Sequence, residues 1–348
     1  MTIQARQVQM VRRPEGKPSP SDFRTVDVSL PDLAPGELLV ENLWMSVDPY
    51  MRRNMDAEAK DLEPWSLNAA LDGPCVGRVI ASLNSEFDEG DIVESLSGWQ
   101  SHFVSDGSAF VPYLTASNSV VKRTHDAAVP RDYVGLLGMA SMTAYAGMRC
   151  LAEFEPGDTV VVSSGAGTVG SLACQIARIR GARVVASAGT HEKVTWLKNE
   201  LGVAEAFNYR SAPISESLQQ LCPNGIDVVL ENASPEHLSA CLPLMNELKT
   251  ILICGFVSIY STGGKVPPFE NFEFALDRFL TIKSFRFMDS LHRYDEFINE
   301  MLEWRDTGVL QFRETVYNGI DSAPEAFCSL FGHEVSGKVL VKLGDKAT

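Results

Sequence analysis

The stretch from Val160 to Lys193 (VVVSSGAGTVGSLACQIARIRGARVVASAGTHEK) constrains the fold of this chain more than any other. Its pattern predicts an apolar strand, a glycine turn, a helix that ends near Gly181, and a second buried parallel strand. A G-x-G-x-x-G turn between a strand and a helix is typical of dinucleotide binding, because it lets the backbone approach a pyrophosphate at the helix N-terminus. We therefore expect the pyrophosphate at Gly165, Ala166, Gly167, Thr168, Val169 and Gly170.

The end of the second strand lacks the acid that commonly binds the adenosine ribose of NAD about 20 residues beyond the glycines. Ser187, Ala188 and Gly189 stand there instead. A site without that carboxylate accepts the 2′-phosphate of NADP, and a nearby cation favours it. We therefore predict NADPH as the cofactor. Lys193, Arg210 and Tyr209 are candidate phosphate partners, although Lys193 taken alone reads equally as a solvated surface lysine.

The pattern of predicted secondary structure in the 348-residue chain changes near residue 130. Before that point, short alternating segments separated by glycines predict a β-rich domain with barrel-like spacing. Beyond it, strands alternate with helices, which predicts a doubly wound parallel sheet. After residue 292 a helix leads back to short strands. We expect one domain from residues 1–130 and 293–348 and a second from 131–292.

The composition excludes several classes of partner. A formal net charge of −15 argues against nucleic-acid or anionic-membrane binding, which require clustered cations. No segment reaches the roughly 18 apolar residues of a membrane span, and the N-terminus shows no apolar signal region. Seven scattered cysteines and six histidines without ligand spacing predict reduced thiols, a cytoplasmic location and no metal site.

Two further segments carry candidate substrate residues. DPYMRR at 48–53 follows a predicted strand, and its Tyr50 and Arg52 either line a substrate cleft or serve as interior and surface residues. GFVSIY at 255–260 follows an apolar strand at the end where open α/β sheets bind ligands. Tyr260 is therefore a candidate to face the nicotinamide, although a loop tyrosine more often packs.

Together these motifs resemble one family, the zinc-independent medium-chain dehydrogenase/reductases, in the branch of prostaglandin/leukotriene reductases and alkenal double-bond reductases. The resemblance runs over most of the chain. The matching segments are DPYMRR (48–53), LGMASMTAYAGM (137–148), SSGAGTVGSLACQIAR (163–178), AGTHEKVTWLKNELG (188–202), NYR (208–210), LEN (230–232), CGFVSIY (254–260) and GKVLVKL (337–343).

The resemblance implies a GroES-like β-rich catalytic domain beside a Rossmann domain, a homodimer, and NADPH-dependent reduction of the C=C bond of α,β-unsaturated ketones and aldehydes. Hydride is expected at the β-carbon, and Tyr260 or water is expected to protonate the α-carbon. Tyr260 and Tyr50 are the implied catalytic residues, and Tyr50, Arg52, Tyr260 and Met288 the expected substrate contacts. Besides the glycine turn, the implied cofactor residues are Gly189, Lys193, Tyr209, Asn232, Cys254, Gly255, Tyr260, Met139, Thr143, Phe285, Arg286 and Phe287.

The chain departs from the family pattern near the expected pocket. His333 and Val335 stand where the closing segment often has Gly and Asn, and Met288 stands in a stretch that is commonly aromatic. Three alternatives stay open: a quinone reductase, an enoyl-thioester or polyketide-tailoring enoyl reductase, and a non-catalytic NADPH-binding protein.

Overall fold

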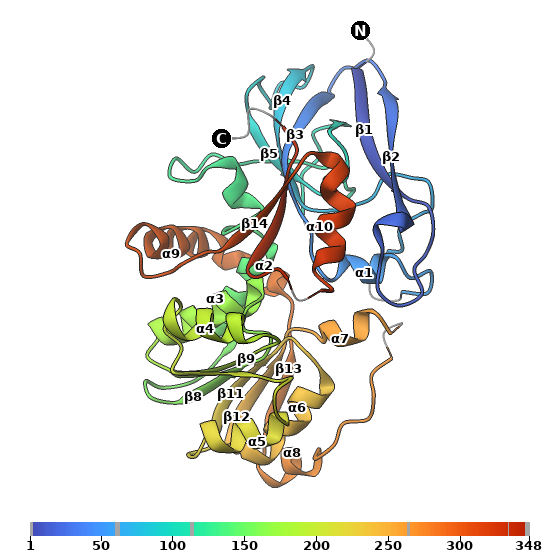
Figure 1. The fold of residues 1–348 in the computed structure, drawn as a ribbon. Coiled ribbons are helices and arrows are strands. Elements are labelled where there is room, and N and C mark those ends of the chain that lie inside the picture. The colour runs from blue at the N-terminus through green and yellow to red at the C-terminus, as the bar shows by residue number, and fades with distance from the viewer. Residues whose placement is uncertain (1–2, 60–62, 112–114, 263–264, 333, 345–348) are drawn as a thin grey trace. The chain divides into compact units, whose positions relative to one another are not determined.

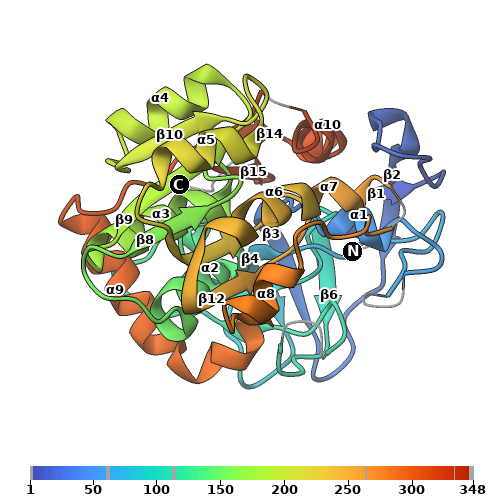
Figure 2. The same cartoon turned by 90° about the horizontal axis from the view of Figure 1, so that it is seen from below.

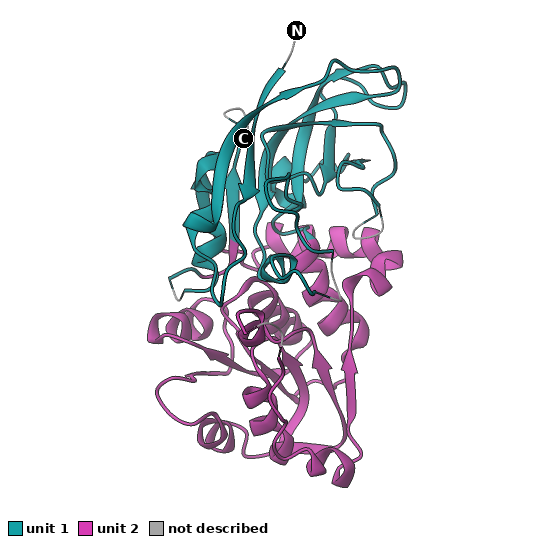
Figure 3. Ribbon diagram, turned by 90° about the vertical axis from the view of Figure 1, so that its right-hand side faces the viewer, with its two compact units in different colours: residues 1–138, 314–335, 339–348 teal, residues 139–313, 336–338 magenta. Residues whose placement is uncertain are grey.

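The computed structural model describes residues 3–59, 63–111, 115–262, 265–332 and 334–344. The chain forms two compact units, each with its own sheet and core. Unit 1 comprises residues 1–138, 314–335 and 339–348, and unit 2 comprises residues 139–313 and 336–338 (Figure 3).

Unit 1 is built on antiparallel strands (Figure 1). Within the described residues, β1 pairs with β2, and a second sheet has the order β14-β15-β3-β4-β5-β7, with β6 paired to β3 off this path. Its strands are β1 Ile3–Met10, β2 Phe23–Leu30, β3 Leu38–Ser46, β4 Cys75–Ser82, β5 Ile92–Ser95, β6 His102–Ser105, β7 Val121–Lys122, β14 Glu314–Asn318 and β15 Lys338–Lys342. The helical segments are η1 Pro20–Asp22, α1 Met51–Asn54, η2 Pro130–Tyr133, η6 Ile320–Ser322 and α10 Ala323–Ser329. The predicted β-rich part of the fold is confirmed.

Aromatic side chains fill the core of unit 1. Trp99 stacks on Phe23 with ring centroids 5.6 Å apart, and Trp65 and Phe327 meet Trp99 edge-on. These rings bury large apolar areas, and edge-to-face contacts add to the stabilisation that burial supplies.

Unit 2 contains a six-stranded parallel sheet of order β10-β9-β8-β11-β12-β13. Numbered from β8, this is the 3-2-1-4-5-6 order of the Rossmann fold, which confirms the predicted doubly wound sheet. The strands are β8 Thr159–Val162, β9 Arg183–Ala188, β10 Glu205–Asn208, β11 Ile226–Glu231, β12 Met245–Ile253 and β13 Thr281–Ser284. The helical segments are α2 Met139–Tyr145, a π-helical turn Ala146–Leu151, α3 Thr168–Ile179, α4 His191–Asn199, α5 Ile214–Leu221, α6 Pro235–Cys241, η4 Leu242–Leu244, α7 Val257–Tyr260, α8 Glu273–Asp277, η5 Phe287–Arg293 and α9 Tyr294–Asp306.

The sheet of unit 2 is buried through its centre, as the runs of β-branched residues predict. Every residue of β8 and β11 is buried. At one edge α4 lies beside β10 (Figure 2). The strand order reverses between β8 and β11, and open α/β sheets bind ligands in the crevice beyond the carboxyl ends of such strands.

The extent of unit 2 differs from the division expected from the sequence. Residues 293–313, which we expected in the β-rich domain, belong to unit 2, and residues 131–138, which we expected in the parallel-sheet domain, belong to unit 1. The reason for the first difference lies in α9, whose Phe297 packs on Tyr145 at 5.4 Å between ring centroids. The Tyr145 hydroxyl also donates to Glu300 Oε2 at 2.7 Å.

Candidate active site

The glycine turn between β8 and α3 has the shape of a phosphate cradle. A Cβ at Gly170 would lie 2.3 Å from the Ser164 carbonyl oxygen, and one at Gly165 would lie 2.9 Å from the Ala186 Cβ. A Cβ at Gly167 would come no nearer than 3.4 Å to any neighbour. The first and third glycines therefore serve packing within the protein. The second keeps side-chain atoms off the N-terminus of α3, where free backbone N–H groups can bind phosphate oxygens.

The turn is also held from the C-terminal part of the chain, which the sequence analysis missed. The backbone N–H of Gly337 donates to the Ala166 carbonyl at 2.9 Å, and the Thr168 hydroxyl donates to the Gly337 carbonyl at 3.1 Å. Gly337 has φ +70°, and a Cβ there would lie 2.1 Å from the Arg313 carbonyl oxygen. The Gly-Lys pair in GKVLVKL was the available signal, but no local rule connects it to a turn 170 residues earlier.

The adenosine end of the expected site lies beyond β9. Thr190 caps α4 by accepting a hydrogen bond from the Lys193 N–H at 3.2 Å, which places Lys193 in the first turn of that helix. A Cβ at Gly189 would lie 2.9 Å from the Tyr209 hydroxyl, so that hydroxyl sits directly against the end of β9. The Arg210 guanidinium lies 5.7 Å from the centre of the Tyr209 ring. Tyr209 and Arg210 thus lie against the end of β9, from which the chain enters α4 with Lys193 in its first turn.

The nicotinamide end of the expected site is formed by the ends of β11 and β12. The Asn232 amide nitrogen donates to the Ser163 carbonyl at 3.0 Å. Within the described residues its amide oxygen is buried without a hydrogen-bond partner, as an acceptor reserved for a ligand or water would be. A Cβ at Gly255 would lie 2.9 Å from the Tyr260 hydroxyl, so Tyr260 in α7 folds back over the end of β12.

Cys254 directly follows β12, and its backbone N–H donates to the Glu231 carbonyl at 2.9 Å. Burial raises the pKa of its thiol to about 12, and the nearby Glu231 carboxylate adds to the shift. At neutral pH the sulfur is therefore a thiol rather than a nucleophilic thiolate.

The remaining cofactor candidates of unit 2 include both packed and exposed side chains. A Cβ at Gly147 would lie 3.1 Å from Phe285, so this ring packs on the π-helical turn. Thr143 donates its hydroxyl to the Met139 carbonyl at 2.8 Å. Phe287 is buried, whereas Arg286 forms an exposed ion pair with Asp289 at 2.9 Å.

The two candidates of unit 1 differ in their surroundings. Tyr50 precedes α1 and packs in part against the core of the unit. Arg52 is 2% exposed, and its guanidinium binds the Gly16 carbonyl at 2.9 Å, the Pro14 carbonyl at 3.3 Å and the Asp56 carboxylate at 2.6 Å. Arg52 thus ties the segment before η1 to α1, a use of the arginine that the sequence alone did not reveal. His333 lies outside the described residues.

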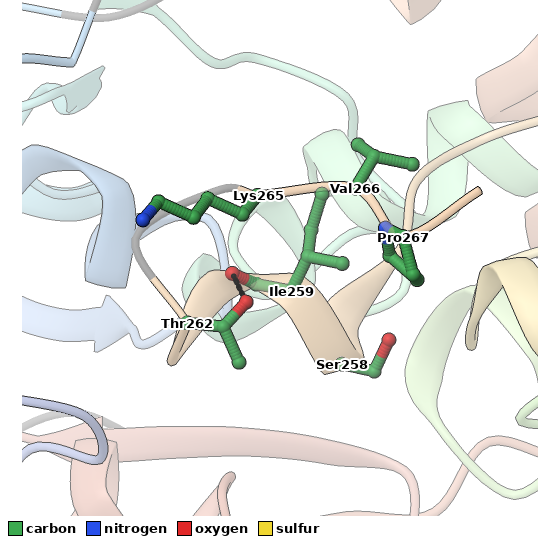
Figure 4. Close-up of a pocket in the computed structure, with 6 residues that line it drawn as sticks. All are labelled: Ser258, Ile259, Thr262, Lys265, Val266 and Pro267. Carbon is green, nitrogen blue, oxygen red and sulfur yellow. Dashed lines mark hydrogen bonds between the residues drawn. The ribbon is translucent and has the colours of Figure 1, made fainter.

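An open depression of about 380 Å³ adjoins α7 (Figure 4). It is lined by Ser258, Ile259, Thr262, Lys265, Val266 and Pro267. The Thr262 hydroxyl donates to the Ile259 carbonyl at 3.0 Å, which closes the last turn of α7 beside Tyr260.

The described part of the chain shows neither a metal-binding cluster nor a membrane-spanning helix. No three His, Cys, Asp or Glu side chains gather there in a way that could hold a metal ion. None of the described helices has the length and apolarity needed to cross a membrane.

Comparisons with known proteins identify the family. The model for the N-terminal domain of oxidoreductase matches residues 6–113, and that for zinc-binding dehydrogenase matches residues 168–304. The chain is 34% identical to prostaglandin reductase 1 of Bos taurus, covering 94% of this chain and 95% of that protein. It is 32% identical to the NADP(+)-dependent 2-alkenal reductase of Nicotiana tabacum, covering 94% of each. The crystal structure of CurA from Vibrio vulnificus in complex with NADPH matches with a TM-score of 0.89 and 31% identity, covering 98% of this chain and 99% of that one.

The chain belongs to the zinc-independent medium-chain dehydrogenase/reductases, in the branch that holds the prostaglandin reductases and alkenal double-bond reductases. It is an NADPH-dependent oxidoreductase of that branch. The predicted family, fold class and cofactor are confirmed. The residues described above fit the cofactor: a glycine cradle for the pyrophosphate, cationic and hydroxyl groups at the expected 2′-phosphate, and an unpartnered amide oxygen at the expected nicotinamide.

Proposed function

We propose that this enzyme reduces the C=C bond of α,β-unsaturated ketones and aldehydes with NADPH. The observation that supports this most is the position of the Tyr260 hydroxyl, against Gly255 at the carboxyl end of β12 and close in sequence to Cys254. A tyrosine hydroxyl is a weakly acidic donor, and the carboxyl ends of the strands are the edge at which open α/β sheets bind ligands.

The chemistry needs little from the protein beyond orientation and one donor. When bound, NADPH supplies the hydride that the β-carbon accepts. Negative charge then develops on the substrate carbonyl oxygen, and Tyr260 is proposed to donate a hydrogen bond to that oxygen. The α-carbon takes its proton from Tyr260 or from water. Asn232 is proposed to bind the nicotinamide end through its free amide oxygen, and Tyr50 to line the substrate mouth.

The state of Cys254 agrees with this substrate class. Enones and enals alkylate thiolates, and a reactive sulfur beside such a substrate would be consumed. The raised pKa of Cys254 keeps the sulfur protonated and slow to react.

The test is NADPH oxidation by the purified protein with a medium-chain 2-alkenal, an aryl enone, an enoyl thioester and a quinone, run in parallel with NADH. Products are identified by mass. A saturated carbonyl product formed faster with NADPH supports the proposal. Activity on the quinone or the thioester alone assigns the enzyme to that substrate instead, and NADPH binding without turnover of any compound contradicts the proposal.

We further propose a homodimer formed through unit 2. Strand β13 is the last strand of the described sheet, and three of its four side chains are exposed. Just before β13 in the sequence, Leu276 is 74% exposed and Phe279 is 69% exposed. Leu248 is also exposed, and its N–H donates to the carbonyl of Arg278, which follows α8. Light scattering of the wild type and of Phe279→Ser tests this: a dimer that weakens in the variant supports it, and a monomeric wild type contradicts it.

A further inference from the structure

A chain of buried polar side chains links the ends of β9 and β11, and it has no part in the proposed reaction. Ser187 and Glu231 are 0% exposed and His237 is 1% exposed. His237 Nε2 lies 3.1 Å from the Ser187 hydroxyl, and His237 Nδ1 lies 2.8 Å from Glu231 Oε2. The order Ser-His-Glu is that of a hydrolase triad, but complete burial of Ser187 prevents it from reaching a substrate.

The second oxygen of Glu231 holds the turn that follows β11. Glu231 Oε1 accepts hydrogen bonds from the Ala233 N–H at 2.6 Å, the Ser234 N–H at 2.9 Å and the Ser163 hydroxyl at 2.7 Å. The Ser163 oxygen in turn accepts the Asn232 N–H at 2.7 Å. One carboxylate thus fixes residues 232–234, which carry the Asn232 amide.

The same turn holds the segment that carries Tyr260. The Glu231 carbonyl accepts the N–H groups of Cys254 at 2.9 Å and Gly255 at 3.2 Å. The Asn232 carbonyl accepts the Val257 N–H at 3.2 Å, and the Ala233 carbonyl accepts the Ser258 N–H at 3.0 Å. Four backbone hydrogen bonds therefore join residues 254–258 to residues 231–233, and two of the four hold the start of α7.

The electrostatics fit an ion pair between the imidazolium of His237 and the Glu231 carboxylate. Burial by itself lowers the pKa of His237, but the Glu231 carboxylate, together with Cys241, whose sulfur lies 3.8 Å from Nδ1, outweighs burial and raises that pKa to about 10. With both ring nitrogens protonated, His237 donates to Glu231 on one side and to Ser187 on the other. A buried charge is tolerated when it is paired and hydrogen-bonded in this way.

We propose that His237 and Glu231 are positioning residues, which hold the Asn232 turn and the start of α7 in register so that Tyr260 and Asn232 face the nicotinamide end of the site. Ser187 anchors the histidine to the end of β9. The role of Tyr260 in this inference rests on the proposed function. The positioning of residues 254–258 rests on the contacts alone.

The experiment compares His237→Leu with the wild type by hydrogen–deuterium exchange, NADPH fluorescence titration and enone reduction. Leucine fills the space but donates no hydrogen bond, so the Glu231 carboxylate loses its partner. We expect faster exchange at the amides of residues 254–258, with and without NADPH. We also expect kcat to fall about 10²-fold, the cost of a misplacement near 1 Å, while the NADPH dissociation constant changes much less.

Two kinds of control separate positioning from general destabilisation. In Glu231→Gln the amide oxygen still accepts the hydrogen bonds of the turn, and the amide nitrogen can donate to a neutral His237. This variant should therefore keep most of the wild-type kcat and the slow exchange at residues 254–258. Asn246→Ala removes the bonds of Asn246 to the Asp227 carboxylate and the Asn224 carbonyl, at the opposite ends of β11 and β12. It should lower the melting temperature and leave both the exchange at 254–258 and kcat unchanged.

The outcomes decide the inference. A folded His237→Leu variant with wild-type exchange at 254–258 contradicts it, and so does faster exchange with unchanged kcat. If His237→Leu does not fold, His237→Gln, which keeps one donor, is measured in the same way, and unchanged exchange and kcat again contradict it. If the wild type binds NADPH but reduces no enone, the proposed substrate is wrong. Exchange at 254–258 and NADPH affinity in the variant then decide the positioning role by themselves.

Discussion

Ser187 stands at the end of β9, where other dinucleotide sites carry the acid that selects NAD. In this structure its side chain is fully buried and faces His237, so an acid at this position would meet the His237 imidazole rather than a ribose. We therefore predict that residues beyond the strand, among them Lys193, Tyr209 and Arg210, discriminate between the two cofactors.

Replacing Lys193 by Ala should weaken the preference for NADPH. Loss of one charge-assisted hydrogen bond to phosphate corresponds to about 1.5–3 kcal/mol, or roughly 10- to 100-fold in kcat/KM for NADPH, with little change for NADH. Steady-state kinetics with both cofactors measure this. Lys198→Ala is the matched control, because Lys198 lies in the same helix and pairs with Glu205 at 3.0 Å. An equal loss with NADH would remove Lys193 from the phosphate site.

Replacing Tyr260 by Phe should lower kcat and leave NADPH affinity nearly unchanged. The removal of one donor to a developing oxyanion typically costs about 10²–10³-fold in rate. Gly255→Ala should act in the same direction, because its new Cβ would lie 2.9 Å from the Tyr260 hydroxyl and displace it. Single-turnover rates and fluorescence titration separate the two quantities. Wild-type turnover in Tyr260→Phe would exclude it from the mechanism.

At the scale of elements, the glycine turn brings the start of α3 against the backbone that follows β8. Ser164 adopts φ +51° at the turn, and Gly170 packs against its carbonyl. The three glycines of one motif therefore perform different tasks, and substitution should separate them.

Gly170→Ala should destabilise the fold, since its Cβ would lie 2.3 Å from backbone. We expect a loss of about 1–3 kcal/mol in the free energy of unfolding, typical of overpacking. Gly167→Ala should leave that free energy within about 1 kcal/mol, because the protein has room for a methyl group there and a glycine-to-alanine change costs little in an unstrained position. It should instead weaken NADPH binding. Urea unfolding of the cofactor-free protein and NADPH titration give the two values, and equal unfolding curves for the two variants would refute this division of roles.

At the scale of the whole molecule, the ion pair of His237 and Glu231 should make stability depend on pH. The pKa of His237 is raised to about 10 in the folded protein, from about 6.5 when unfolded. The folded state therefore binds more protons than the unfolded state between these values, so the free energy of unfolding falls as the pH rises through that window. The stabilisation is complete below about pH 6.5 and lost above about pH 10.

Urea unfolding at pH 7 and pH 9.5 tests this, with His237→Gln as the comparison. The wild type should lose at least about 1 kcal/mol more than the variant, the equivalent of one pKa unit. A parallel decline in both proteins would show that other groups account for the pH dependence.

The sequence by itself determined the periodic and local features of this protein. Neighbouring residues determine the alternation of strands and helices, the glycine turn, the Thr190 cap and the absence of the acid. This is because backbone conformation and short-range patterning depend on residues close in sequence. The position of GFVSIY after an apolar strand indicated Tyr260, and the resemblance to a family added Asn232.

Only the tertiary structure decided which distant groups share a contact. Gly337 binds a turn 170 residues earlier in the chain, and α9 packs in the unit of the parallel sheet. The Arg52 guanidinium binds backbone carbonyls of unit 1, and His237 contacts Glu231 and Ser187 in the interior of unit 2. No sequence period encodes these pairings. They arise because burying an unpaired donor or charge costs free energy, so each such group pairs with whichever partner the packed sheet brings within reach.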